Sequence, residues 1–139
     1  MGQSRYTNGK SNSVANKSQR SMEAIVQVWV DGSCLNNGIN NANSAVGIYY
    51  GPEDQRNFSS KLSGDKQTNN RAELLAVLYV LCTNLVTTNL KIYTDSQYSI
   101  KCLTEYHCRW QLNGWTTSKG GAVESVSIIK YSLGLTTSI

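Results

Sequence analysis

The stretch from Ile25 to Cys34, IVQVWVDGSC, constrains the fold more than any other part of the chain. Five of its first six residues are apolar and three of these are valine, which is typical of a β-strand covered on both faces. Asp31 follows, and the turn-forming residues Gly32 and Ser33 predict that the strand ends there. An acid at the end of a hydrophobic strand is costly to desolvate unless a positive charge meets it. We therefore expect Asp31 to face a cation.

The residues after this strand predict a short antiparallel meander and then a strand–helix–strand crossover. Apolar periodicity and turn signals predict strands at 45–51, 55–62 and 90–95, and helices at 68–84, 97–105 and 124–133. Residues 106–114 are predicted to form a basic, aromatic connector. Short links favour antiparallel pairing of the first three strands, whereas the crossover favours parallel pairing of the fourth strand with the first. The sequence therefore predicts an α/β (α+β) fold in which helices flank a mixed sheet.

Three acids fall at related places in this arrangement. Asp31 and Asp95 end the two parallel strands, and Glu73 lies on the helix between them. Parallel neighbours would bring both aspartates to one edge of the sheet, about 5 Å apart by strand spacing, where α/β sheets place ligands. Each acid alone is typical of a solvated turn residue. The three together predict a metal site, because clustered carboxylates repel and oxygen ligands suit Mg²⁺ or Mn²⁺.

Length and composition exclude several other classes of protein. The 139 residues suffice for one domain, and no apolar run approaches the ~20 residues of a membrane span. The four cysteines include no Cys-x-x-Cys pair, and His107 does not complete a zinc site, so we expect reduced thiols. We expect a monomer that does not bind membranes.

The positive charge is concentrated in the first 22 residues. The chain has 13 Lys and Arg against 9 Asp and Glu, and the excess of four lies in residues 1–22, which contain no acid. This segment is too polar to fold alone, so we expect a disordered basic tail before a domain at 23–139. The tail either aids solubility or attracts phosphates weakly. It shows no amphipathic helix, which favours the nucleus or cytoplasm over the mitochondrion.

Three short motifs carry the acids: VDGSC at 30–34, QTNNRAEL at 67–74 and YTDSQY at 93–98. The segment WQLNGWTTSKG follows at 110–120. In this order they resemble the three catalytic motifs and the basic protrusion of type 1 ribonuclease H. The resemblance implies a ribonuclease H-like fold and an endonuclease that cuts the RNA strand of RNA–DNA hybrids with two Mg²⁺ ions, for which Mn²⁺ can substitute. It makes Asp31, Glu73 and Asp95 catalytic metal ligands, with Gly32 in the metal site.

The same resemblance implies contacts with both strands of the hybrid. The residues implied at the RNA strand are Ser33, Asn37, Asn69, Asn70 and Gln97. The residues implied in a pocket for a DNA-strand phosphate are Lys66 and Thr68. The residues implied in the DNA channel are Tyr106, Arg109, Trp110, Ser118 and Lys119. Amides suit minor-groove edges and 2′-hydroxyl groups, whereas cations position phosphates.

Some of these residues also have purely structural interpretations. Asn69 and Asn70 are typical of a helix start, and Thr68 is a good N-cap. Trp110 and Trp115 are as typical of core packing as of a nucleic-acid surface.

The chain departs from the family pattern after Glu124. The family continues with a helix, a final strand, a histidine-bearing loop and a last helix with a fourth metal-binding aspartate, whereas residues 125–139 supply at most the first helix. We therefore expect the last strand and helix to be missing, turnover to be reduced and residues 90–94 to form an exposed sheet edge. Two alternatives stay open: a hybrid-binding module that does not cut, and a flavodoxin-like module, which would need a glycine-rich phosphate loop after the first strand.

Overall fold

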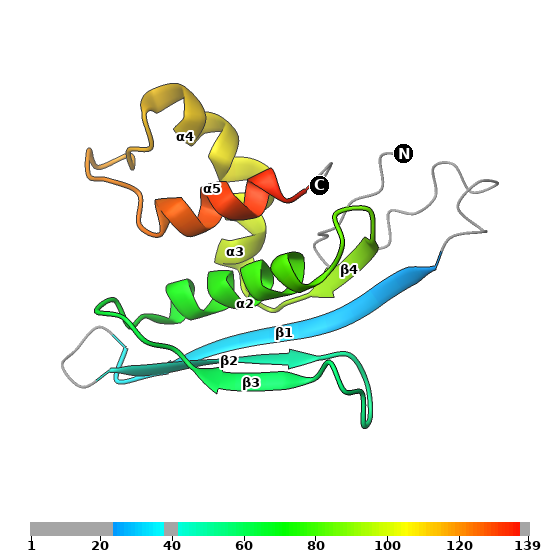
Figure 1. Cartoon of the computed structure of the whole chain (residues 1–139). Coiled ribbons are helices and arrows are strands. Elements are labelled where there is room, and N and C mark those ends of the chain that lie inside the picture. Colours follow the sequence, from blue (N-terminus) through cyan, green and yellow to red (C-terminus); the bar gives the residue numbers. More distant parts are fainter. Residues whose placement is uncertain (1–23, 38–41, 137–139) are drawn as a thin grey trace.

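A mixed four-stranded sheet forms one layer of the protein (Figure 1). The computed structural model describes residues 24–37 and 42–136, so the predicted tail at 1–22 lies outside the described residues. The strands are β1 (Ile25–Leu35), β2 (Asn43–Tyr49), β3 (Phe58–Lys61) and β4 (Asn89–Tyr93), in the order β3-β2-β1-β4. β1 pairs antiparallel with β2 and parallel with β4, and β2 pairs antiparallel with β3. The predicted topology is confirmed, and β4 is an edge strand among the described strands.

The helices all lie on one side of this sheet (Figure 1). They are α2 (Asn69–Thr83), α3 (Gln97–Lys101), the π-helical segment η1 (Cys102–Tyr106), α4 (His107–Asn113) and α5 (Val126–Gly134). α2 packs on β1 and β2, and α5 packs on the other side of α2. None of the helices in the described part of the chain is long and apolar enough to cross a membrane.

α2 supplies the centre of the hydrophobic core. Thr68 adopts an extended conformation and caps the helix, because its hydroxyl accepts a hydrogen bond from the Arg71 backbone N–H at 3.2 Å. The side chains of α2 in the hydrophobic core cluster are Leu74, Ala76, Val77, Val80 and Leu81. They pack against the buried strand residues Val28, Ile48, Leu90 and Ile92. The helix therefore has a fixed position over the strands that carry the acids.

β1 differs from its prediction in two ways. Its side chains alternate, so that Val28 and Val30 are buried whereas Trp29 and Asp31 are exposed; only the face toward α2 is covered. The strand also continues through Gly32 to Leu35 instead of ending at Asp31, because β1 still pairs with β2 there. On the open face the Trp29 ring stacks on Tyr93 at 4.8 Å and lies 6.3 Å from Tyr49.

The predicted connector at 106–114 is helical, which corrects the sequence interpretation. α3, η1 and α4 follow one another without a break and end at Gly114, whose φ is 77°. The apolar spacing of Leu103, Tyr106 and Trp110 continues the helical period of the preceding segment. Trp110 is 7% exposed and belongs to the core.

β3 is shorter than predicted, because residues 55–57 belong to the preceding turn. In that turn Arg56 forms an ion pair with Asp54 at 2.8 Å.

The four cysteines are free, as predicted. Burial raises the pKa of the Cys102 thiol to about 11, which keeps that buried side chain protonated and unreactive.

Candidate metal and nucleic-acid site

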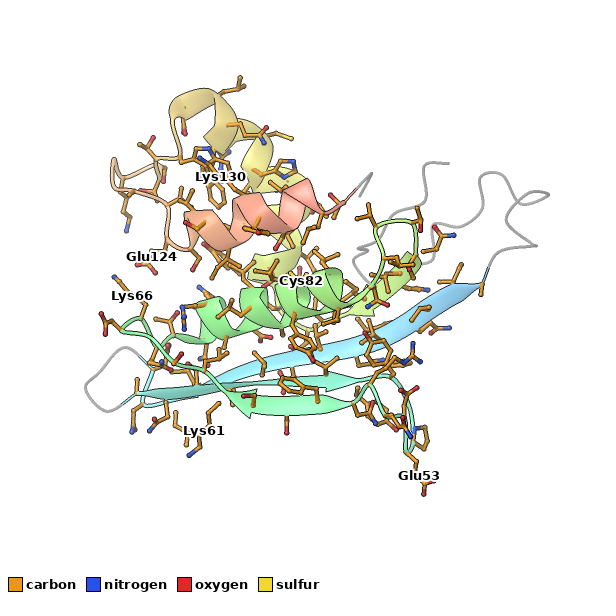
Figure 2. The ribbon with its side chains drawn as sticks, viewed as in Figure 1. Glu53, Lys61, Lys66, Cys82, Glu124 and Lys130 are labelled. Carbon is orange, nitrogen blue, oxygen red and sulfur yellow. The ribbon has the colours of Figure 1, made fainter. Side chains whose placement is uncertain are left out.

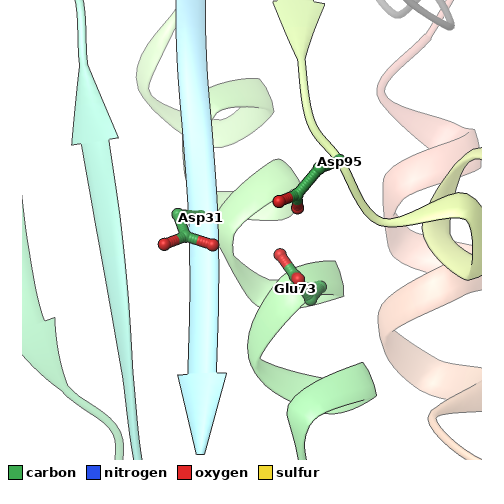
Figure 3. Close-up of side chains that lie close together, drawn as sticks. All are labelled: Asp31, Glu73 and Asp95. Carbon is green, nitrogen blue, oxygen red and sulfur yellow. The ribbon is translucent and has the colours of Figure 1, made fainter.

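Three carboxylates from three elements point toward one another (Figure 3). Asp31 lies on β1, Glu73 on α2 and Asp95 just after β4, and one oxygen of each lies within 4.8 Å of the others. The parallel register explains the placement of the aspartates: Trp29 pairs with Tyr93, and each aspartate comes two residues later. The sequence argument that brought these acids to one point of the sheet is confirmed.

Glu73 reaches the aspartates because Gly32 has no side chain. The Gly32 backbone N–H donates a hydrogen bond to the Glu73 Oε1 at 2.9 Å. A Cβ at Gly32 would lie 2.4 Å from the Ala72 carbonyl carbon and 2.4 Å from the Glu73 backbone nitrogen. The glycine therefore allows α2 to touch β1 at this point.

The charges of these acids are not neutralised within the described part of the chain. No Lys or Arg described there forms a salt bridge with any of the three; the single recorded ion pair joins Arg56 and Asp54. Burial, together with the neighbouring Asp31 and Asp95 carboxylates, raises the pKa of Glu73 to about 7, although the hydrogen bond from Gly32 opposes this shift. A divalent cation bound among these three carboxylates would relieve their mutual repulsion. The donor set fits Mg²⁺ or Mn²⁺.

Polar side chains surround the start of α2, next to the acids in sequence. Asn69 and Asn70 are exposed in the first turn of the helix. The Asn37 Oδ1 accepts a hydrogen bond from the Asn69 backbone N–H at 3.0 Å, so the loop after β1 meets the helix start. Ser33 is exposed on the same face of β1 as Asp31. These predicted RNA-strand residues therefore lie on two adjacent segments.

A pocket of about 520 Å³ lies between the start of α2 and the start of α5. Lys66, Thr68 and Arg71 line one side, and Glu124 and Ser125 lie on the other (Figure 2 labels Lys66 and Glu124). The predicted phosphate contacts thus share a real cavity. The Thr68 hydroxyl is used as an acceptor by the helix cap, and its proton stays available for a ligand oxygen.

A cluster of aromatic rings and cations joins η1, α4, the loop after α4 and α5. The Trp110 ring lies 5.5 Å from Tyr106 and 5.9 Å from Trp115. The Arg109 guanidinium lies 5.8 Å from the Tyr106 ring centre, and the Lys130 ammonium lies 5.1 Å from that of Trp115. This basic-aromatic cluster presents positive charge around a packed aromatic centre.

Residues 23–137 match the sequence model of one protein family, RNase H. The chain belongs to the RNase H family. The resemblance to ribonuclease H that the sequence motifs indicated is therefore confirmed.

The chain is similar to several curated RNase H proteins. It is 41% identical over 102 residues to Ribonuclease H of Schizosaccharomyces pombe, covering 73% of this chain and 38% of that protein. It is 36% identical over 105 residues to Ribonuclease H1 of Homo sapiens, covering 73% and 36%. It is 33% identical over 103 residues to Ribonuclease H of Hahella chejuensis, covering 74% and 67%. The matched region thus spans little more than a third of the eukaryotic relatives.

Solved structures share the fold of this RNase H chain. The foamy viral protease-reverse transcriptase in complex with RNA/DNA hybrid has a TM-score of 0.64 and 20% identity, covering 78% of this chain and 15% of that one. The RNase H domain of PFV, solved in solution, has a TM-score of 0.57 and 24% identity, covering 78% and 70%.

Within this RNase H fold, the predicted nucleic-acid contacts differ in their exposure. Trp110 is 7% exposed and packs with Tyr106 and Trp115, so its contact with a nucleic acid stays a prediction. Four other predicted nucleic-acid contacts in residues 97–119 are exposed: Gln97, Arg109, Ser118 and Lys119.

Three residues that line the pocket or the basic-aromatic cluster were not predicted from the sequence. Arg71 lines the pocket, and its Nη1 is buried without a hydrogen-bond partner. Ser125 starts α5 with a positive φ of 59° on the far side of the same pocket. Lys130 reaches Trp115 from α5. The first was recognisable from its place in the QTNNRAEL motif, whereas the other two depend on where α5 packs.

Proposed function

We propose that this protein hydrolyses the RNA strand of RNA–DNA hybrids. The observation that carries the proposal is the carboxylate cluster of Asp31, Glu73 and Asp95, whose ligand oxygens lie within 4.8 Å of one another on an RNase H fold. Relatives named Ribonuclease H and a structural neighbour in complex with an RNA/DNA hybrid support the choice of substrate. Because the match covers little more than a third of the eukaryotic relatives, the activity is tested on this chain itself.

The three acids would hold two Mg²⁺ ions. Such a pair supplies an activated water and stabilises the leaving oxygen. Asp31 approaches from within β1, Asp95 from the residues just after β4, and Glu73 from α2. The Gly32 N–H holds the Glu73 carboxylate through its Oε1. The protein thus contributes fixed ligand positions rather than a mobile nucleophile.

The surface around the acids suits a hybrid better than a DNA duplex. Exposed amides of Asn69 and Asn70 lie one helical turn before Glu73, where they can bond 2′-hydroxyl groups and minor-groove edges. On the other side, Lys66 and Thr68 would bind a DNA phosphate in their pocket, and Arg109 and Lys119 would attract the DNA strand.

Cleavage of an end-labelled RNA–DNA hybrid in Mg²⁺ tests the proposal. We expect cuts in the RNA strand only, and none in matched DNA–DNA or RNA–RNA duplexes. Asp31→Asn should lower the rate about a hundredfold or more, because it removes charge where the reaction needs it. Asp54→Asn, the same chemical change in the exposed turn beside Arg56, should leave the rate unchanged.

The outcomes of this assay distinguish an enzyme from a module that only binds hybrids. Hybrid binding with no Mg²⁺-dependent cut would replace the proposal by a module that recognises hybrids without cleaving them. Equal cleavage by wild type and Asp31→Asn would remove the carboxylate cluster from the reaction.

A further inference from the structure

The side chain of Gln67 is the centre of a hydrogen-bond network beside the phosphate pocket. Its Oε1 accepts from the Ser44 backbone N–H at 2.9 Å and from the Ser44 hydroxyl. Its Nε2 donates to the Gly64 carbonyl at 2.9 Å and to the Leu62 carbonyl at 3.3 Å. A primary amide has two donor hydrogens and two acceptor lone pairs, so Gln67 has none left for a ligand.

The backbone of Gln67 is held as well. Its carbonyl accepts a hydrogen bond from the Cys34 thiol at 3.2 Å. Cys34 and Ser44 are paired residues near the end of the β1–β2 ladder, and Ser44 is 3% exposed. Gln67 therefore fastens the segment before α2 to two strands at a rigid point of the sheet.

The neighbours of Gln67 on both sides line the phosphate pocket. Lys66 precedes it and Thr68 follows it, and both border the cavity between α2 and α5. Lys66 is exposed on a loop, so its backbone depends on the network next to it. We propose that Gln67 is a positioning residue that holds Lys66 and Thr68 where they bind a phosphate of the nucleic acid. This inference rests on the proposed function and deepens it.

The carboxylate cluster has a separate anchor. Glu73 is fixed by the Gly32 N–H and by the contact of α2 with β1, six residues beyond Gln67. Loss of the Gln67 amide should therefore weaken substrate binding and leave the chemical step intact. We expect KM for the hybrid to rise about tenfold with kcat within about twofold of wild type. The slope of log Kd against log salt should fall by about 0.7–0.9, the effect of one lost phosphate contact.

The test compares Gln67→Met, which keeps the side-chain length, with Gln55→Met in the exposed turn between β2 and β3. Kd and its salt dependence are measured on a short RNA–DNA hybrid in EDTA, and kcat and KM are measured in Mg²⁺. A double-mutant cycle with Lys66→Met isolates the coupling, because Gln67→Met should add little once Lys66 is gone. Ser44→Ala removes a single bond of the network and should shift KM in the same direction by less.

The results decide between three cases. A raised KM, a reduced salt slope and non-additivity with Lys66→Met support the positioning role. If Gln67→Met does not fold, the same pattern in Ser44→Ala supports it and a wild-type salt slope in Ser44→Ala overturns it. A fall in kcat at unchanged KM, or full additivity, also overturns it while the proposed function stands. Absence of hybrid binding by the wild-type chain would overturn both.

Discussion

Glu73 is the residue whose ionisation most directly links the site to stability. Its neighbours and its burial raise its pKa to about 7, against an ordinary value of 4.5. Between these two pH values the folded protein binds more protons at this site than the unfolded chain does. The free energy of unfolding therefore falls as pH rises through this range.

We expect the melting temperature of the metal-free protein to decrease between pH 5 and pH 7.5 and then to level off. Glu73→Gln should remove most of this decrease, because the amide has no proton to lose. Differential scanning calorimetry in EDTA measures it. Asp54, whose pKa Arg56 holds at about 2, stays ionised across this range and makes Asp54→Asn the matched control. A decrease of equal size in Glu73→Gln would contradict the assignment.

Gly32 is the second residue on which the site depends. The Cβ that Gly32→Ala introduces meets backbone atoms of Ala72 and Glu73, which cannot rotate away. We expect overpacking to lower the free energy of unfolding by about 1–3 kcal/mol, or somewhat more, in urea denaturation. Hybrid cleavage should be lost in the fraction that stays folded. Gly47→Ala, where a Cβ meets nothing within 4 Å, should leave cleavage unchanged.

At the scale of elements, the sequence predicted where strands and helices pair but misjudged where two of them end. Gly32 and Ser33 have turn-forming character, yet β1 continues through them because pairing with β2 and the close contact of α2 at Gly32 outweigh local preference. The segment 106–114 was predicted to be a connector because it is basic and aromatic. It forms α4 instead, because its apolar residues recur with helical spacing. The meeting of the two aspartates was predictable, since their positions follow from the parallel register. The reach of Glu73 also depends on the close contact of α2 with β1 at Gly32.

Trp110 is the residue through which α4 contributes to the core. Its ring sits between Tyr106 and Trp115 in the core that joins η1, α4 and the following loop. Trp110→Ala should lower the free energy of unfolding by about 3–5 kcal/mol in urea titrations. Trp29→Ala, which removes an exposed ring stacked on Tyr93, should cost about 0.5–1.5 kcal/mol. Similar costs for both would place Trp110 outside the core.

At the scale of the whole molecule, the described helices cover one face of the sheet (Figure 1). Trp29 and Tyr49 are exposed on the other face. The carboxylates lie where these two faces meet, since Asp31 belongs to the open face and Glu73 to the covered one. Ligand binding there should therefore affect the stability of the entire domain.

Mn²⁺ or Mg²⁺ should raise the melting temperature of the wild-type chain. An ion present at a hundred times its Kd stabilises the folded state by about 2.7 kcal/mol. Thermal melts in a divalent-ion titration measure the shift, with Asp31→Asn expected to lose most of it and Asp54→Asn to keep it. An equal rise in Asp31→Asn would mean that the ions bind elsewhere.

The contact between Gly32 and α2 also limits how the site can change. Only a hydrogen atom fits as the side chain at position 32, so β1 and the 15-residue helix α2 are in direct backbone contact there. This contact sets the distance between the backbones of Asp31 and Glu73. No rotamer or side-chain exchange at that position can adjust it. The spacing of the backbone segments that carry Asp31 and Glu73 is therefore a property of the fold and not of a side chain at position 32.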